Sequence, residues 1–297
     1  MPGTAIVFGV DDGFVLPLGV ALRSLVANSP AALADTDVIV LHEELAPASV
    51  SRLRCHAEAL GDRLRLVPWR LRDEGYRTAP NGTRANSLRL FMDRVLPEHG
   101  RALYLDCDLL ILDDLAPLLA TDLGGRPLAA VRDPFQPTYG RSGLVMPGWQ
   151  ELGIPRDREY FNSGVMLFDL ETCRRERLFD RAIRFLAQHP EHVGIGDQDA
   201  LNWAVGDRWL RLDRAWNTAP MSAVVVDGCI AYGMDDVVPL QTLVDEEPAA
   251  RVMHYMTRLK PWRVGYPVGP ALRRYARFLL EARAAEARAG IQAAAST

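Results

Sequence analysis

An apolar segment, residues 101–112, contains two aspartates, Asp106 and Asp108, separated by one residue. A buried carboxylate is costly unless a cation or hydrogen-bond donors compensate its charge. Because alternate side chains of an extended chain point the same way, the two aspartates share a face and Cys107 points away. Two hard oxygens at the open end of a buried strand suit a divalent cation that also holds phosphate. The simpler alternative is a strand followed by an acidic turn.

Apolar runs typical of strands alternate with runs of helical spacing through the first part of the chain. We expect strands at residues 4–10, 37–41, 63–67 and 103–108, and helices at 16–27, 48–60 and 87–95. This alternation indicates the α/β class, with a mostly parallel, doubly wound sheet. Ligands of such sheets bind beyond the carboxyl ends of the strands, where Asp11, Asp12, Asp106 and Asp108 all fall. The coincidence favours a metal or nucleotide site.

The pattern is less regular beyond Asp114. We expect further strands at residues 128–131, 161–170 and 251–255, and helices at 171–188, from the acidic loop 194–199 through 204, and at 271–289. The last of these is amphipathic and rich in alanine, arginine and glutamate, so we predict a helical tail at the C-terminus.

Composition excludes several classes of protein. The net charge of −4 provides no basic surface for nucleic acid. Four dispersed cysteines are too few for a disulfide scaffold or a zinc pattern, which predicts reduced thiols in a cytoplasmic protein. The first apolar run lacks a positively charged start and ends at Asp11, so we interpret it as a strand and not a signal peptide. No apolar stretch is long enough to span a bilayer.

Several motifs follow one another in a distinctive order. They are the strand ending at Asp11-Asp12, Arg89 in a helix, Tyr104-Leu105-Asp106-Cys107-Asp108, Phe161-Asn162-Ser163-Gly164, Asp197-Gln198-Asp199, and His254 followed by Lys260-Pro261-Trp262. Together they resemble the family 8 retaining glycosyltransferases of GT-A fold, which include glycogenin and bacterial lipooligosaccharide galactosyl- and glucosyltransferases. The resemblance covers residues 4–262. It implies a Rossmann-like, mostly parallel sheet flanked by helices, a catalytic domain over residues 1–262 and a C-terminal helical extension over 263–297.

The resemblance also implies a metal site. Asp106 and Asp108 would bind Mn²⁺ bridging the donor diphosphate, with His254 as the third protein ligand. An imidazole beside two carboxylates fits Mn²⁺ better than Mg²⁺, the alternative ion, which prefers an all-oxygen shell. Lys260 would contact the diphosphate as a point charge.

Other implied roles concern the UDP-sugar donor. Val10, Asp11, Asp12 and Phe14 would bind the uridine, with Asp11 accepting from uracil N3–H and Phe14 stacking on the base. Thr257 stands where the family usually has a glycine near the diphosphate, and its side chain would either crowd the phosphates or donate to them. Gly13 is a second departure, because related enzymes often carry asparagine there.

The remaining implied residues lie around the transferred sugar. Arg89 and Asp133 would hold sugar hydroxyls and diphosphate near the reaction centre. Asn162, Asp197 and Gln198 would line the sugar pocket, whereas Asp199 would support the start of its helix. Since the Gln198 amide is a poor nucleophile, we favour same-face attack, with the leaving phosphate as base.

We therefore expect a Mn²⁺-dependent retaining transferase that moves glucose or galactose from its UDP-sugar to an unidentified acceptor hydroxyl. A nucleotidyltransferase acting on sugar phosphates is an alternative, but it would require a glycine-rich phosphate loop that residues 9–13 do not supply. A non-catalytic UDP-sugar-binding relative is another. We expect a small-molecule or glycan acceptor, bound by loops 76–84, 134–155 or 221–233. The C-terminal tail has few aromatic residues, so we do not expect it to bind a membrane surface. The sequence is compatible with a homodimer.

Overall fold

A computed structural model describes residues 3–71, 84–141 and 146–291 of the chain. Its main sheet has seven strands in the order β3-β2-β1-β4-β7-β6-β8. These are β1 Gly3–Gly9, β2 Thr36–His42, β3 Leu64–Pro68, β4 His99–Leu105, β6 Leu128–Arg132, β7 Phe161–Asp169 and β8 Trp209–Arg211. Only β7 runs antiparallel to its neighbours, β4 and β6. The predicted α/β class with a mostly parallel sheet is therefore confirmed.

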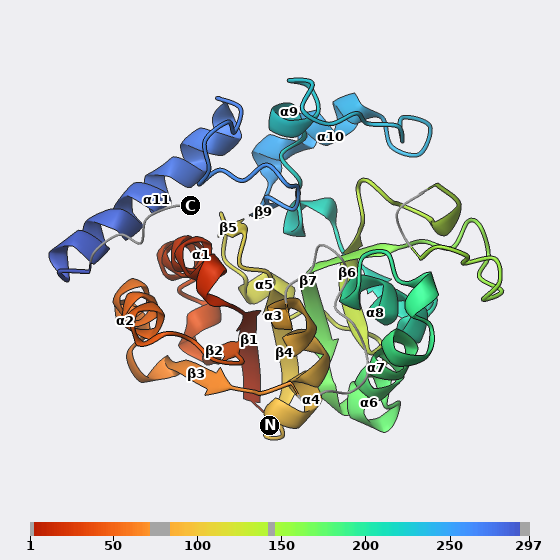
Figure 1. Cartoon of the computed structure of the whole chain (residues 1–297), viewed down its shortest axis with the longest axis horizontal. Helices are drawn as coiled ribbons and strands as arrows, with labels where there is room; N and C mark the ends of the chain where they lie inside the picture. Colours follow the sequence, from red (N-terminus) through yellow and green to blue (C-terminus); the bar gives the residue numbers. More distant parts are fainter. Residues whose placement is uncertain (1–2, 72–83, 142–145, 292–297) are drawn as a thin grey trace.

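The central strands are apolar along their length because both faces of the sheet are covered. On β1, Ala5 and Val7 point into one core, and Ile6 and Phe8 point into the other. Figure 1 shows α1, α2 and α11 on one side of the sheet and α6, α7 and α8 on the other. A near-continuous run such as residues 4–10 therefore has no polar face.

The helices are short apart from α1 and α11. The α-helices are α1 Val15–Asn28, α2 Pro47–His56, α3 Arg84–Ser87, α4 Met92–Val95, α5 Ala116–Leu119, α6 Leu170–Arg175, α7 Leu178–Gln188, α8 Asp197–Val205, α9 Met221–Val224, α10 Leu240–Glu246 and α11 Pro270–Arg288. The 3₁₀ turns are η1 Asp12–Phe14, η2 Ala32–Ala34, η3 Glu58–Arg63, η4 Leu88–Phe91, η5 Tyr139–Arg141, η6 Pro190–His192, η7 Arg214–Trp216 and η8 Glu247–Ala249. Within the described ranges, none of the helices combines the length and apolarity needed to cross a bilayer.

Four predicted elements differ from the structure. The helix expected at 48–60 ends at His56, and the 3₁₀ turn η3 follows it. The helix expected at 171–188 is wrong, because Arg177 adopts a left-handed conformation (φ 52°) and separates α6 from α7. The helix expected at 87–95 is divided among α3, η4 and α4. The continuous strand expected through Asp108 is also wrong, since β4 ends at Leu105 and the chain turns before it resumes as β5, Leu109–Ile111.

Strand β5 belongs to a separate two-stranded sheet. It pairs antiparallel with β9, Val252–His254, in a register that sets Leu109 opposite His254. The two strands lie above the carboxyl end of the main sheet (Figure 1). A segment from near the end of the chain is thereby placed beside the two aspartates.

The C-terminal helix α11 is fixed to the main body by a buried carboxylate. Glu286 accepts from Arg52 Nε at 2.8 Å and from His56 Nε2 at 2.9 Å. Burial lowers the pKa of His56, although Glu286 acts in the opposite direction, so the neutral imidazole donates through Nε2. Its Nδ1 accepts from Arg23 Nε at 3.3 Å. Helix α11 thus packs on α1 and α2 through a satisfied polar cluster.

We expect Glu286→Ala to reduce the free energy of unfolding by about 2–3 kcal/mol, because it leaves the half-buried Arg52 and the buried His56 without their acceptor. The control is Glu281→Ala on the same helix, whose i,i+4 pair with Arg277 is exposed and stabilises by at most about 0.5 kcal/mol. Urea denaturation followed by circular dichroism measures both. Equal losses for the two variants would contradict the assigned role of Glu286.

Candidate active site

The candidate site lies where the carboxyl ends of β1 and β4 meet β9. Asp106 leaves β4 with its backbone N–H still bonded to Gly164 O, at 2.9 Å. The Asp108 carbonyl accepts from Tyr255 N at 3.0 Å, which joins the aspartate turn to the end of β9. Between them, Cys107 donates its thiol proton to Gly9 O at the end of β1. Backbone and side-chain bonds therefore hold this acidic turn from three directions.

Asp106, Asp108 and His254 converge in space. His254 Nε2 lies 3.2 Å from Asp108 Oδ1 and 3.7 Å from Asp106 Oδ2. One ligand atom from each residue lies within 4.8 Å of the other two. Two carboxylate oxygens and one imidazole nitrogen at this separation fit a single divalent ion such as Mn²⁺.

Gly164 makes room for the histidine. A Cβ atom at this position would lie 2.2 Å from His254 Cε1 and 2.6 Å from His254 Nδ1. Any side chain at residue 164 would therefore displace the imidazole from the two aspartates. This contact is a physical reason for the glycine in the Asn162-Ser163-Gly164 motif.

Lys260 completes this cluster. Its Nζ donates to Asp108 Oδ2 at 2.6 Å and to Tyr255 O at 2.7 Å. Burial by itself raises the pKa of Asp108, but Lys260 and His254 outweigh it, so the pKa lies well below its ordinary value. Asp108 is therefore a carboxylate at neutral pH, as a metal ligand must be.

Arg89 pairs with one aspartate from each of two motifs, Asp106 after β4 and Asp197 at the start of α8. It donates to Asp106 Oδ1 at 2.7 Å and to Ser163 O at 2.7 Å, and its Nε lies 2.9 Å from Asp197 Oδ2. The guanidinium also lies over the Tyr104 ring, 4.2 Å from its centroid. Burial lowers the pKa of Arg89, but Asp106 and Asp197 reverse the shift and keep it charged. In this arrangement Arg89 orients both carboxylates.

Asp133, Asn162 and Gln198 form a second polar group. Asp133 Oδ2 accepts from Asn162 Nδ2 at 3.0 Å and from Gln198 Nε2 at 3.3 Å. Its Oδ1 accepts two backbone N–H groups, from Phe135 and Gln136. Gln198 Oε1 accepts from Ser163 N at 2.9 Å, so the orientation of the Gln198 amide is determined at both ends.

The residues predicted for uridine lie after β1. Asp11 caps η1 by accepting from Phe14 N, and the Phe14 ring packs edge-on against Trp262 at 6.0 Å. Asp12 is exposed and accepts from Ala46 N at the start of α2. The Val10 side chain is buried in the core, and its backbone N–H donates to Leu41 O at 2.9 Å.

Two other predicted residues have contacts of their own. Thr257 Oγ1 donates to Leu259 O at 3.3 Å. Asp199 accepts from Gly194 N and Ile195 N, and so supports the loop that precedes α8. Of the three loops predicted for the acceptor, residues 76–83 and 142–145 lie outside the described residues.

Sequence reasoning missed Asn217. Its Oδ1 lies 2.9 Å from His254 Nδ1, and its Nδ2 donates to Asn162 Oδ1 at 2.9 Å. No local pattern distinguishes this asparagine from any other. Only the pairing of distant segments reveals its contact with the histidine.

Gly164→Ala should weaken Mn²⁺ binding by at least about tenfold, because the new methyl group occupies the place of the His254 ring. Titration followed by the electron paramagnetic resonance signal of free Mn²⁺ measures the affinity. Gly233→Ala is the control, since a Cβ there meets nothing within 4 Å. Wild-type affinity in Gly164→Ala would show that the imidazole is not a ligand.

Ionisation of Asp197 should make the free energy of unfolding depend on pH. Burial raises its pKa to about 6, with Arg89 opposing and Asp106 adding to the shift. Because this value exceeds the unfolded-state pKa of about 4, wild type loses stability through this group as pH rises from 4 to 6. The unfolding free energy of Asp197→Asn relative to wild type should therefore rise by about 3 kcal/mol between pH 4 and pH 7.

Urea denaturation at several pH values tests this expectation. The buffer should contain a chelator, because a cation beside Asp106 would favour the charged form of Asp197. A difference between variant and wild type that does not change with pH would contradict it.

Comparison with known proteins identifies relatives over most of the chain. The match to Glycosyl transferase family 8 spans residues 5–264. Glycosyltransferase GlyF of Streptococcus pneumoniae serotype 4 is 27% identical over 259 residues, which are 87% of this chain and 57% of GlyF. Lipopolysaccharide 1,2-glucosyltransferase of Escherichia coli K12 is 24% identical over 274 residues, which are 91% of this chain and 75% of that enzyme. The chain spans 57% of GlyF and 38% of General stress protein A of Bacillus subtilis.

The fold is also similar to solved structures. Galactosyltransferase LgtC, in complex with donor and acceptor sugar analogs, superposes with a TM-score of 0.75 at 25% identity, over 93% of this chain and 95% of LgtC. The predicted GT-A fold is thus confirmed. Since the family match covers most of the sequence and the structural likeness covers nearly the whole fold, this chain belongs to glycosyl transferase family 8.

Proposed function

We propose that this chain is a Mn²⁺-dependent retaining hexosyltransferase that moves glucose or galactose from its UDP-sugar to an acceptor hydroxyl. The observation that carries the proposal is the convergence of Asp106, Asp108 and His254, with Lys260 beside Asp108. When bound there, the ion would offset the negative charge that develops on the UDP leaving group.

Lys260 provides a second positive charge at the same place. Its ammonium lies 2.6 Å from Asp108 Oδ2, so a diphosphate bound at the aspartates would be within its reach. A preformed positive charge stabilises the leaving group without reorganisation, and loss of such a group costs roughly a hundredfold or more in rate. Thr257 lies between His254 and Lys260 in the sequence, and we place it at the same phosphates.

We assign the donor sugar to the group formed by Asp133, Asn162, Asp197 and Gln198, with Arg89 positioning its acids. Asp133 accepts four hydrogen bonds and Asp197 pairs with Arg89, so neither carboxylate is unengaged. The Gln198 amide is a poor nucleophile. These contacts support same-face attack by the acceptor, with its proton passing to the leaving phosphate.

We assign the uracil to Asp11 and Phe14, and the adjoining ribose to the backbone carbonyl of Val10 and to Asp12. These residues follow β1, and the turn with Asp106 and Asp108 follows β4, which is the parallel neighbour of β1. The base and the diphosphate would therefore lie along one edge of the sheet. The names of the E. coli glucosyltransferase and of LgtC support a hexose in the donor.

We also infer a cytoplasmic protein with a small-molecule or glycan acceptor. All four cysteines lie within the described residues and are free thiols, which suits a reducing compartment. The net charge of −4 argues against a nucleic-acid partner.

Isothermal calorimetry tests the proposal. UDP should bind wild type at least about tenfold more tightly with Mn²⁺ than without, because the ion bridges the aspartates and the diphosphate. Asp108→Asn should lose this enhancement, whereas Asp113→Asn, an exposed aspartate just after β5, should keep it. The same enhancement in Asp108→Asn and wild type would contradict the metal assignment.

A product assay with UDP-glucose and UDP-galactose separates the proposed reaction from nucleotidyl transfer. A hexosyltransferase releases UDP, and slow hydrolysis of the donor should be detectable even before the acceptor is known. Release of pyrophosphate from a nucleoside triphosphate and a sugar phosphate would contradict the proposal.

A further inference from the structure

A chain of side-chain hydrogen bonds runs from His254 into the protein. His254 Nδ1 lies 2.9 Å from Asn217 Oδ1, Asn217 Nδ2 lies 2.9 Å from Asn162 Oδ1, and Asn162 Nδ2 lies 3.0 Å from Asp133 Oδ2. All four side chains are buried, and Asn217 is only 2% exposed. The chain joins the candidate metal site to the group assigned to the donor sugar.

The direction of this chain is determined by groups that can act in only one way. The backbone N–H of Gly164 is a donor, and it points at Asn162 Oδ1 from 2.9 Å. Asn162 must therefore present its oxygen to Asn217 and its Nδ2 to Asp133. Asn217 must in turn present its Nδ2 to Asn162, which leaves Oδ1 as an acceptor for His254.

Only a protonated Nδ1 satisfies this acceptor. A neutral imidazole carries one N–H, so in the neutral ring that a metal ion requires, the proton on Nδ1 is donated to Asn217 and the lone pair lies on Nε2. Nε2 is the atom that faces Asp106 and Asp108. Asn217 thereby selects the tautomer that can bind a metal ion and holds the ring in the required orientation.

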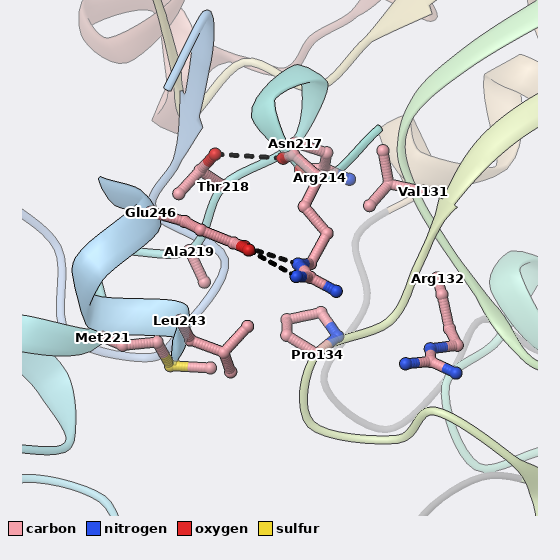
Figure 2. A pocket seen from close by; sticks show the side chains of 10 residues that line it. All are labelled: Val131, Arg132, Pro134, Arg214, Asn217, Thr218, Ala219, Met221, Leu243 and Glu246. Carbon is pink, nitrogen blue, oxygen red and sulfur yellow. Dashed lines mark hydrogen bonds and ion pairs between the residues drawn. The ribbon is translucent and has the colours of Figure 1, made fainter. Parts of the chain in front are cut away.

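The segment that carries Asn217 is itself firmly attached. Arg214 of η7 makes two hydrogen bonds to Glu246 of α10, at 2.6 and 2.5 Å, and Thr218 Oγ1 donates to Arg214 O (Figure 2). The backbone of Thr218 bonds on both sides to β9, through Val252 O and His254 N, each at 2.9 Å. Asn217 is therefore fixed relative to the strand that carries His254.

We propose that Asn217 is a positioning residue that presents His254 Nε2 to the metal ion and connects it, through Asn162, to the sugar-binding group at Asp133. The inference rests on the proposed function. Outer hydrogen-bond partners of metal-binding histidines typically contribute 10- to 100-fold to metal affinity. We expect the same range here.

The test measures Mn²⁺ affinity by electron paramagnetic resonance, with and without UDP, in four proteins. Asn217→Leu has a similar volume but no polar atoms and should bind Mn²⁺ at least about tenfold more weakly than wild type. Asn217→Asp keeps the acceptor for His254 but loses the donor to Asn162, and it should stay within about threefold of wild type. Thr218→Val, which removes only the neighbouring hydroxyl, should bind as wild type does.

A purely structural role for Asn217 predicts another result. Asn217→Asp introduces a buried charge beside Asn162, so it would then be at least as damaging as Asn217→Leu. Thermal melting monitored by circular dichroism separates loss of stability from loss of affinity. Equal Mn²⁺ affinity in Asn217→Leu and wild type would overturn the inference while leaving the proposed function intact. No Mn²⁺ binding by wild type would overturn both.

A measurement on the wild-type protein covers the case in which Asn217→Leu does not fold. The ¹⁵N shifts of labelled histidine report which ring nitrogen carries the proton, and His254→Gln identifies the signal by its loss. In the metal-free protein at pH 8 we expect His254 protonated at Nδ1. An unprotonated Nδ1, with the proton on Nε2 alone, would overturn the inference.

Discussion

Pairing between β5 and β9 is the constraint on which the site depends. Neither the aspartates after β4 nor the histidine of β9 can form a metal site alone, and the register that sets Leu109 opposite His254 brings them together. The same pairing brings Lys260 to Asp108, because Asp108 immediately precedes β5 and Lys260 follows β9. Gly164, on the neighbouring β7, permits this approach by leaving the space that the imidazole fills.

Ion pairs compensate the negative charge of the aspartates that lie around the paired strands. Asp106, Asp108 and Asp197 are held near one another by Arg89 and Lys260, the cations that pair with them. Buried carboxylates need such partners or their pKa rises, as it does for Asp197, which shares Arg89 with Asp106. A divalent ion would satisfy the acids that the two side-chain cations leave incompletely compensated.

The polar groups assigned to the sugar are connected to the metal ligands and do not form an independent pocket. Gln198, Asn162 and Asp133 share bonds with one another and with the backbone of β7. Through Asn217 they also reach His254. A network in which each amide has one permitted orientation offers a preorganised site, which is what charge-developing reactions require.

The sequence by itself determined the α/β class, every strand of the main sheet except β8, the acidic turn after β4 and, through its ordered motifs, the family. These follow from local patterns of apolar residues and from residue types at fixed spacing. It did not determine the break of β4 before Asp106, the division of α6 from α7 at Arg177, or the contact of Asn217 with His254. Those depend on which distant segments pair and on how much space a neighbour leaves. Such information arises only when the chain packs, because a side chain's partner across the sheet is not encoded in its neighbours along the sequence.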